Sequence, residues 1–279
     1  MQYGVFLLKG TDMEQNKRGI SSFVLKMIAI TAMLIDHIGG VVLETHIDQL
    51  APGVMMTGGP EEIQTLAMAH PALMLTYLIF RLIGRFGFPL FAFMIAEGFT
   101  HTRSVKKYAL NLGIFALISE LPFNLASRRR LFCPSYQNVF FTLLLGLLCI
   151  WAIHEFAESK RFGEEKWKQV LITILAVVVC AGAAELLGTD YGMWGVSAIA
   201  ILYILRKRRK TAFALACLIL TIMNSMEITA FLMLIPIALY NGERGPKLNK
   251  YIFYAFYPVH LAILYLIALS LGFVTFTVR

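Results

Sequence analysis

The residues best suited to chemistry lie inside the first long apolar segment of the chain. This segment, SSFVLKMIAITAMLIDHIGGVVL, is long enough to cross a bilayer as a helix, which takes about 20 residues. It nevertheless carries Lys26, Asp36 and His37. A charged group on a spanning helix costs at least about 2.5–3.5 kcal/mol, so it usually faces protein or a water-filled cavity and usually has a function. We therefore interpret the Asp36–His37 pair as functional.

The spacing of Lys26 and His37 predicts a track along one face of this helix. Eleven residues correspond to three turns plus about 20°, so the two side chains lie roughly 16 Å apart along the axis. A cation near one end and an imidazole deeper in would suit a long anionic ligand with a reactive tip. Snorkelling of Lys26 to the membrane surface is an equally good reading of that residue. Asp36 lies about 80° around the helix from the face that carries Lys26 and His37, so it would reach His37 only through a neighbouring helix or a water.

The second apolar stretch, PALMLTYLIFRLIGRFGFPLFAFMIAEGFTH, adds two polar pairs at helical spacing. Arg81 and Arg85 are four residues apart, and so are Glu97 and His101. Guanidinium groups bind phosphate or carboxylate through two parallel hydrogen bonds, so the arginines are predicted to hold an anion. A structural pairing with a glutamate inside the bundle is the alternative. Pro89 and the nearby glycines predict a kinked or broken helix.

Further polar residues lie in or beside the later apolar segments. Glu120 and Asn124 flank Pro122, where a helix is expected to kink or stop, and polar groups at such a break often line a cavity. His260 lies inside an apolar run and either faces the same cavity or is a packed, hydrogen-bonded residue. The remaining candidates for this cavity are Asn138 and Tyr257. The sequence contains no CxxC, HExxH or zinc-type spacing, so no metal site is predicted.

The composition indicates what must position these side chains. The chain is 58% hydrophobic and 15% charged, whereas soluble domains have roughly 25% charged residues. The apolar runs are too long for barrel strands, so the predicted fold class is all-α. We expect a transmembrane helix bundle of about nine or ten spans forming one domain, residues 21–279, after an N-terminal segment, residues 1–20. The lipid bilayer is then the first partner. The net charge of +8 does not indicate nucleic acid, because the basic residues cluster in short loops between spans.

Charge placement predicts the orientation in the membrane. The stretch from Glu44 to His70 contains no Lys or Arg and reads as an irregular loop on the outer side. Most Lys and Arg fall on the other side, so we predict a multi-pass protein of the cytoplasmic membrane with a cytoplasmic N-terminus. The run Arg128 to Arg130 contradicts this rule, because it falls on the predicted outer side. Asp190, before the sixth apolar segment, is predicted to be a helix N-cap.

Several segments resemble the TraX family. They are LKMIAITAMLIDHIGG, IGRFGFPLFAFMIAEGFTHTRSVKKYALNL, IFALISELPFNL, NVFFTLLLGLL, DYGMWGV and FYPVHL. The resemblance covers nearly all the chain after Ser22. It implies an acetyl or acyl transfer from cytosolic acetyl-CoA to an amine or hydroxyl of a membrane or envelope acceptor. The family also looks distantly like multi-span acyltransferases, one branch of which separates an Arg and a His by ten residues in the first span. Lys26 and His37 keep that spacing.

The resemblance implies roles for the polar residues. His37 would be the general base on the acceptor or would carry a brief acetyl group, and Asp36 would fix its tautomer. Lys26, Arg81 and Arg85 would hold the phosphates of acetyl-CoA. The expected cavity or substrate residues are Glu97, His101, Glu120, Asn124, Asn138, Tyr257 and His260. The acceptor is a peptide amine, as in the pilin N-terminus of the family's founding member, or a sugar or envelope polymer.

Two other functions compete with the enzyme. Buried Asp, His, Arg and Glu side chains also build proton relays, so a proton-coupled transporter is the main alternative. Inverted repeats with paired broken helices would favour it, but only one clear break occurs, near Pro89. A scaffold within a secretion or conjugation machine is the third possibility, and it would not need ionisable residues at several depths.

Overall fold

The protein is a bundle of helices. The computed structural model describes residues 19–158 and 165–274, so almost all of the expected N-terminal segment 1–20 lies outside the described residues. Within the described ranges the regular elements are helices, and two isolated bridges pair Ile20 with Tyr240 and Gln137 with Thr189. The all-α fold class is therefore confirmed.

The first helical rod is longer than the sequence predicts. It comprises α1 (Ser22–His37), the π-helical turn η1 (Ile38–Leu43) and α2 (Glu44–Leu50), 29 residues in all. The expected irregular loop after Glu44 is wrong, since α3 (Val54–Thr57) and α4 (Pro60–Ala69) follow directly. Pro60 is the first residue of α4, where its missing N–H would have no helical partner in any case. The proline and glycines read as loop signals are thus helix boundaries.

The second apolar stretch is broken as predicted. It forms α5 (Pro71–Gly84) and α6 (Gly87–His101), which are separated by a turn at Arg85 and Phe86. Pro89 lies in the first turn of α6, a position that tolerates proline. The break matters for the site because it places the buried Arg85 at the junction of two helices.

The remainder of the bundle follows in sequence order. The next helix, α7 (Val105–Arg128), runs through Pro122, so of the expected kink or stop at that proline the stop is wrong. The later elements are α8 (Val139–Ala152), η2 (Ile153–Glu158), α9 (Lys166–Leu186), α10 (Gly192–Ile204), η3 (Arg206–Arg208), α11 (Arg209–Met223), η4 (Ser225–Met233), α12 (Leu234–Leu239) and α13 (Lys250–Ser270).

Six helical stretches in the described residues are long and apolar enough to cross a membrane. The expectation of nine or ten spans counted three further segments, which are the 13-residue α10, the 15-residue α11 and the run Ser225–Leu239. These are shorter than the roughly 20 residues that a full crossing needs. The apolar character of α10 reflects burial inside the bundle, since it packs against α6, α8, α9 and α11. The other two segments also expose apolar side chains, among them Ile222 and Ile235.

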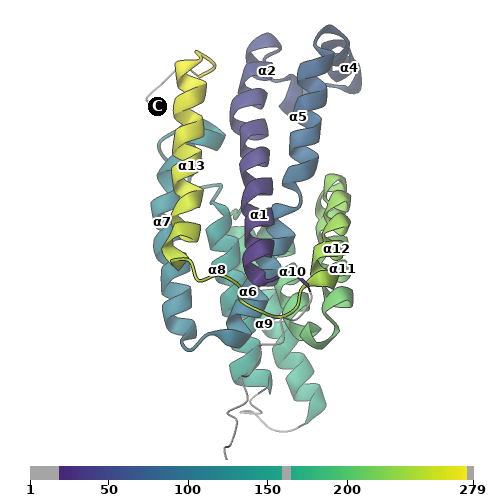
Figure 1. Ribbon diagram of the computed structural model, residues 1–279, viewed down its shortest axis with the longest axis vertical. Coiled ribbons are helices and arrows are strands. Elements are labelled where there is room, and N and C mark those ends of the chain that lie inside the picture. Colours follow the sequence, from purple (N-terminus) through teal and green to yellow (C-terminus); the bar gives the residue numbers. More distant parts are fainter. Residues whose placement is uncertain (1–18, 159–164, 275–279) are drawn as a thin grey trace, which may run out of the picture.

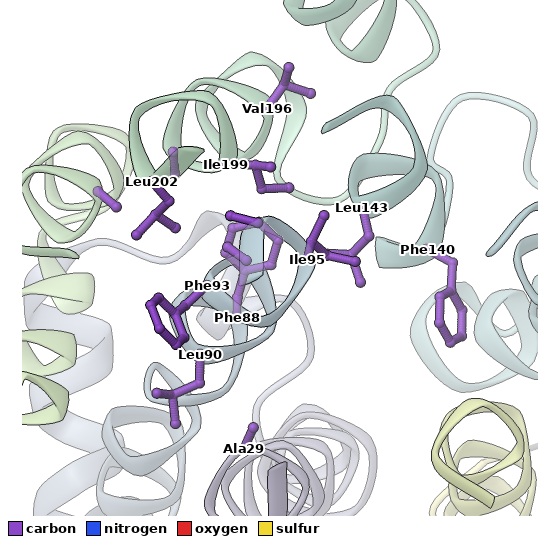
Figure 2. Close-up of a cluster of buried hydrophobic side chains, with 14 of the residues drawn as sticks. Ala29, Phe88, Leu90, Phe93, Ile95, Phe140, Leu143, Val196, Ile199 and Leu202 are labelled. Carbon is purple, nitrogen blue, oxygen red and sulfur yellow. The ribbon is translucent and has the colours of Figure 1, made fainter. Parts of the chain in front are cut away.

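The core of the bundle lies around α6 and α10. Figure 2 shows Phe88 of α6 beneath Ile199 of α10, with Ile95 of α6 beside Leu143 of α8. In contrast, α9 exposes an apolar face at helical spacing, which suits contact with lipid. Its exposed members include Val170, Leu171, Ile174, Leu175, Val178 and Val179. Figure 1 shows α2, α4 and the end of α13 rising above the shorter helices α10, α11 and α12.

The basic run after α7 has a local counter-ion. Arg129 forms an ion pair with Asp48 of α2 at 2.9 Å, and Arg128 lies over the ring of Tyr136 at 4.3 Å. This end of α7 therefore lies beside the segment that lacks Lys and Arg. The exception to the charge rule is partly offset by the pairing with Asp48.

Candidate functional site

Two histidines from opposite ends of the sequence meet in the bundle. His37 Nδ1 lies 2.6 Å from His260 Nε2, and the two rings stack with centroids 4.8 Å apart. His260 is buried, and its Nδ1 lies 2.6 Å from the carbonyl oxygen of Phe256, one turn earlier in α13. Tyr257 presents its ring to both histidines at 5.8 Å. The late histidine is therefore the direct partner of His37.

Asp36 does not make the expected contact with His37. Its Oδ1 instead accepts from Arg85 Nη2 at 2.8 Å and from Arg81 Nη1 at 2.9 Å. Two guanidinium groups thus share one carboxylate oxygen at the break between α5 and α6. In addition, Arg85 Nε donates to the carbonyl oxygen of Arg81 at 3.1 Å. This arrangement orients the arginines and leaves Asp36 as their counter-ion.

Glu227 completes the ion-pair network, and sequence reasoning missed it as a site residue. Its Oε1 accepts from Arg85 Nη1 at 3.2 Å, and its side chain is fully buried. Thr229 holds this part of η4 against α5 by donating to the carbonyl oxygen of Leu82 at 3.0 Å. Arg85 therefore forms the structural pair with a glutamate that is the alternative to anion binding. The sequence signal that could have identified Glu227 is a single acidic residue between two apolar runs.

The group Glu120, Asn124 and Asn138 forms a separate network between α7 and α8. Asn138 is the N-cap of α8, since its Oδ1 accepts from the Phe140 N–H at 3.1 Å. Its own N–H and side-chain amide both donate to Glu120 Oε1, and Asn124 Nδ2 donates to Glu120 Oε2 at 3.3 Å. None of these three residues lines the cavity described below.

Asp190 is not the N-cap that the sequence predicts. The cap position of α10 belongs to Tyr191, which makes no side-chain capping bond, and Asp190 instead accepts a hydrogen bond from the hydroxyl of Tyr136. A glutamate at the end of α9, Glu185, accepts from the Met193 N–H at 3.2 Å. Asp190 therefore joins the loop before α8 to the turn before α10.

A cavity of about 950 Å³ opens at the other end of α1. It lies among α1, α6, α7, α13 and the segment 240–250, and it contains three of the predicted residues, Lys26, Glu97 and His101. His37, Arg81 and Arg85 do not line it. The candidate residues are thus divided among a cavity, a buried ion-pair centre beside the histidines, and the Glu120 network.

Positively charged side chains line the cavity. Its lining residues include five cations, Lys26, Arg103, Lys107, Arg244 and Lys250. None of these five forms an ion pair within the described part of the chain. Lys26 points its ammonium group over the ring of Phe253 at 5.3 Å, and Glu97 accepts from the hydroxyl of Tyr240 at 3.0 Å. Unpaired cations around one space favour an anionic ligand.

Aromatic rings separate this cavity from the histidines. Phe140 and Tyr254 line the cavity. The Phe140 ring meets the edge of Tyr257 at 5.2 Å, and Tyr257 in turn meets His37. Two aromatic rings, Phe140 and Tyr257, therefore link the lining of the cavity to the imidazole pair.

The spanning helices and the polar centre between them define a multi-pass helical membrane protein. The family model described as TraX protein matches residues 21–268, so the chain belongs to the TraX family. A curated relative is the probable fimbrial assembly protein FimC, serogroup H1, of Dichelobacter nodosus. It is 28% identical over 270 residues, which cover 88% of this chain and 94% of that protein. No solved structure matches the chain.

Proposed function

We propose that the protein is a membrane acyltransferase that moves an acetyl group from acetyl-CoA to an amine or hydroxyl of an envelope acceptor. The cationic cavity is the observation that carries this proposal. Coenzyme A is a long polyanion, and the space of about 950 Å³ is lined by five cations that form no ion pair with any residue the structure describes. Ligand pockets commonly measure about 300–1,000 Å³. Lys26, Arg244 and Lys107 are the residues that we assign to its phosphates.

The cavity also suggests which end of the bundle faces the donor. Arg103, Lys107, Arg244 and Lys250 line it and are exposed, and positive residues mark the cytoplasmic side of membrane proteins. We therefore place the cavity and the start of α1 in the cytoplasm of a bacterial cell, with the protein in the inner membrane. Acetyl-CoA would then enter without crossing the bilayer.

His37 is our candidate for the reacting group. It lies three turns from Lys26 along α1, roughly 16 Å by helical rise, which is of the order of a pantetheine arm. Its Nε2 makes no hydrogen bond within the described chain. This nitrogen is also not one of the side-chain atoms that are both buried and without a partner. This nitrogen is therefore available as a general base or as the nucleophile of a brief acetyl-histidine.

The name of the FimC relative points to the acceptor. That protein is named a probable fimbrial assembly protein. We propose the free N-terminal amine of a pilin subunit as the first acceptor to test, with a sugar or envelope polymer as the alternative. An amine attacks the thioester only in its neutral form, which requires a base of the kind that His37 supplies.

The test of this function begins with donor binding. Purified protein in detergent should bind acetyl-CoA, and the pair Lys26→Gln and Arg244→Gln should weaken binding at least tenfold. Lys207→Gln removes an exposed cation outside the cavity and is the matched control. Labelled acetyl transfer to a peptide amine should then disappear in His37→Ala while acetyl-CoA still binds. Wild-type protein without acetyl-CoA binding, or full transfer by His37→Ala, would defeat the proposal.

One observation favours a second function, a proton-coupled transporter. Glu227 Oε2 is buried and has no hydrogen-bond partner in the described chain, although its Oε1 pairs with Arg85. A carboxyl group in this setting can carry a proton through a membrane protein. Proton flux into liposomes that depends on Glu227 and occurs without acetyl-CoA would favour this alternative.

A further inference from the structure

We propose that His260 is the proton store of the reaction. It keeps the hydrogen of the uncharged His37 ring on Nδ1, and it accepts this proton when His37 takes up another from the acceptor. This inference rests on the proposed function. It follows from a chain of two short hydrogen bonds, one between the imidazole rings at 2.6 Å and one from His260 to Phe256 at 2.6 Å.

The direction of these bonds is determined by their last member. The carbonyl oxygen of Phe256 can only accept, so His260 Nδ1 must carry a hydrogen. In the uncharged ring, His260 Nε2 is then a bare acceptor. His37 Nδ1 must therefore donate to it, and the uncharged His37 ring has no hydrogen on Nε2. The backbone of α13 thus selects the tautomer of a histidine in α1.

This tautomer places the basic lone pair where a substrate can meet it. His37 is half-buried, and its Nε2 is the one ring nitrogen of the pair with no partner in the described chain. Asp36, the partner expected from sequence, is held by Arg81 and Arg85 instead. His260 therefore takes the orienting role that an aspartate has in other histidine bases.

The reaction step balances without any further reactant. The acceptor nitrogen forms a bond to the thioester carbonyl carbon, and its proton moves to His37 Nε2. The Nδ1 proton of His37 moves at the same time to His260 Nε2, so the positive charge rests on His260, whose Nδ1–H still bonds Phe256. When the carbon–sulfur bond breaks, the proton returns along the same path to the departing thiolate. The products are the amide and free CoA.

A proton store and a purely packed ring make different predictions. His260→Gln keeps a carbonyl group able to accept from His37 Nδ1 but cannot take up a proton. We expect its kcat to fall at least tenfold, within the range that general bases contribute. The KM for acetyl-CoA should stay unchanged, because His260 does not line the cavity. His70→Gln, which alters an exposed histidine before α5, is the matched control and should retain wild-type kcat.

The proton positions are measured without turnover. Nitrogen NMR of the full-length protein with labelled histidine, assigned with His37→Ala and His260→Ala, should show both rings with hydrogen on Nδ1. A hydrogen on His37 Nε2, or wild-type kcat in His260→Gln, would overturn the relay. Failure of the wild-type protein to transfer acetyl would defeat the proposed function and the proton-store role together. A wild-type enzyme that is active with the other tautomer would overturn the relay alone.

Discussion

Gly84 leaves the space that the Asp36 carboxylate occupies. A Cβ atom built on Gly84 would overlap both carboxylate and Cβ atoms of Asp36. The last residue of α5 thus has no side chain because α1 brings a charged group against it. This contact determines how closely Asp36 approaches the two arginines that flank Gly84.

Gly84→Ala is therefore expected to disrupt the site although alanine normally favours a helix. The added methyl must displace Asp36 from Arg81 and Arg85, and overpacking of this kind typically costs about 1–3 kcal/mol. Thermal unfolding in detergent should show a clear loss of stability. Gly182→Ala in α9 is the matched control, since nothing lies within 4 Å of its added Cβ and alanine is the better helix former by about 0.5–1 kcal/mol. Equal thermal stability of the two variants would refute the close-packing argument.

The pairing of Arg85 with Glu227 predicts a rescue by double substitution. Arg85→Met leaves Glu227 as a fully buried carboxylate without a counter-ion, and breaking such a pair costs about 3–5 kcal/mol. Adding Glu227→Gln removes that charge, so the double variant should unfold at a higher temperature than Arg85→Met alone. Glu227→Gln in the wild-type background should cost less, because Arg85 keeps Asp36. Strictly additive losses in this double-mutant cycle would mean that the two side chains do not interact.

The sequence predicts those site residues that can be identified within a single segment, and it does not predict contacts between distant segments. Charges within apolar runs singled out Asp36, His37, Arg81 and Arg85, and helical spacing predicted that the arginines share a face. The partner of His37 is 223 positions away in α13, and no periodicity within one helix carries that information. The carboxylate next in sequence therefore seemed the better partner than the histidine.

The errors in the fold have the same origin. A run of apolar residues reads as a membrane span whether lipid or protein surrounds it, so α10 was expected to cross the membrane although its neighbours bury it. The sequence at Pro122 predicts a kink or a stop, but α7 continues through this proline and packs against α8 and α13. Both the burial of α10 and the continuation of α7 depend on tertiary packing. The pattern of residues within one sequence does not reveal this packing.

The aromatic separation between cavity and histidines predicts a change in acyl-group preference. Phe140 lines the cavity and contacts Tyr257, so Phe140→Ala should enlarge the cavity on the side of His37. We expect butyryl-CoA to be used better relative to acetyl-CoA in this variant, measured as the ratio of the two kcat/KM values. Phe115→Ala changes an aromatic residue outside the cavity lining and serves as the control. An unchanged ratio in Phe140→Ala would place the acyl group elsewhere.

The Glu120 network predicts that two asparagine caps of the same type differ in importance. Asn138 caps α8 and also donates to Glu120, whereas Asn249 caps α13 from an exposed position and accepts from the Tyr251 N–H at 3.0 Å. Loss of an N-cap costs about 1 kcal/mol, which is the expectation for Asn249→Ala. Asn138→Ala also removes the side-chain donor to Glu120, which adds about 1–3 kcal/mol. Unfolding measurements should therefore rank Asn138→Ala well below Asn249→Ala in stability. Adding Glu120→Gln to Asn138→Ala should recover part of the loss, because it neutralises the carboxylate that has lost its donor.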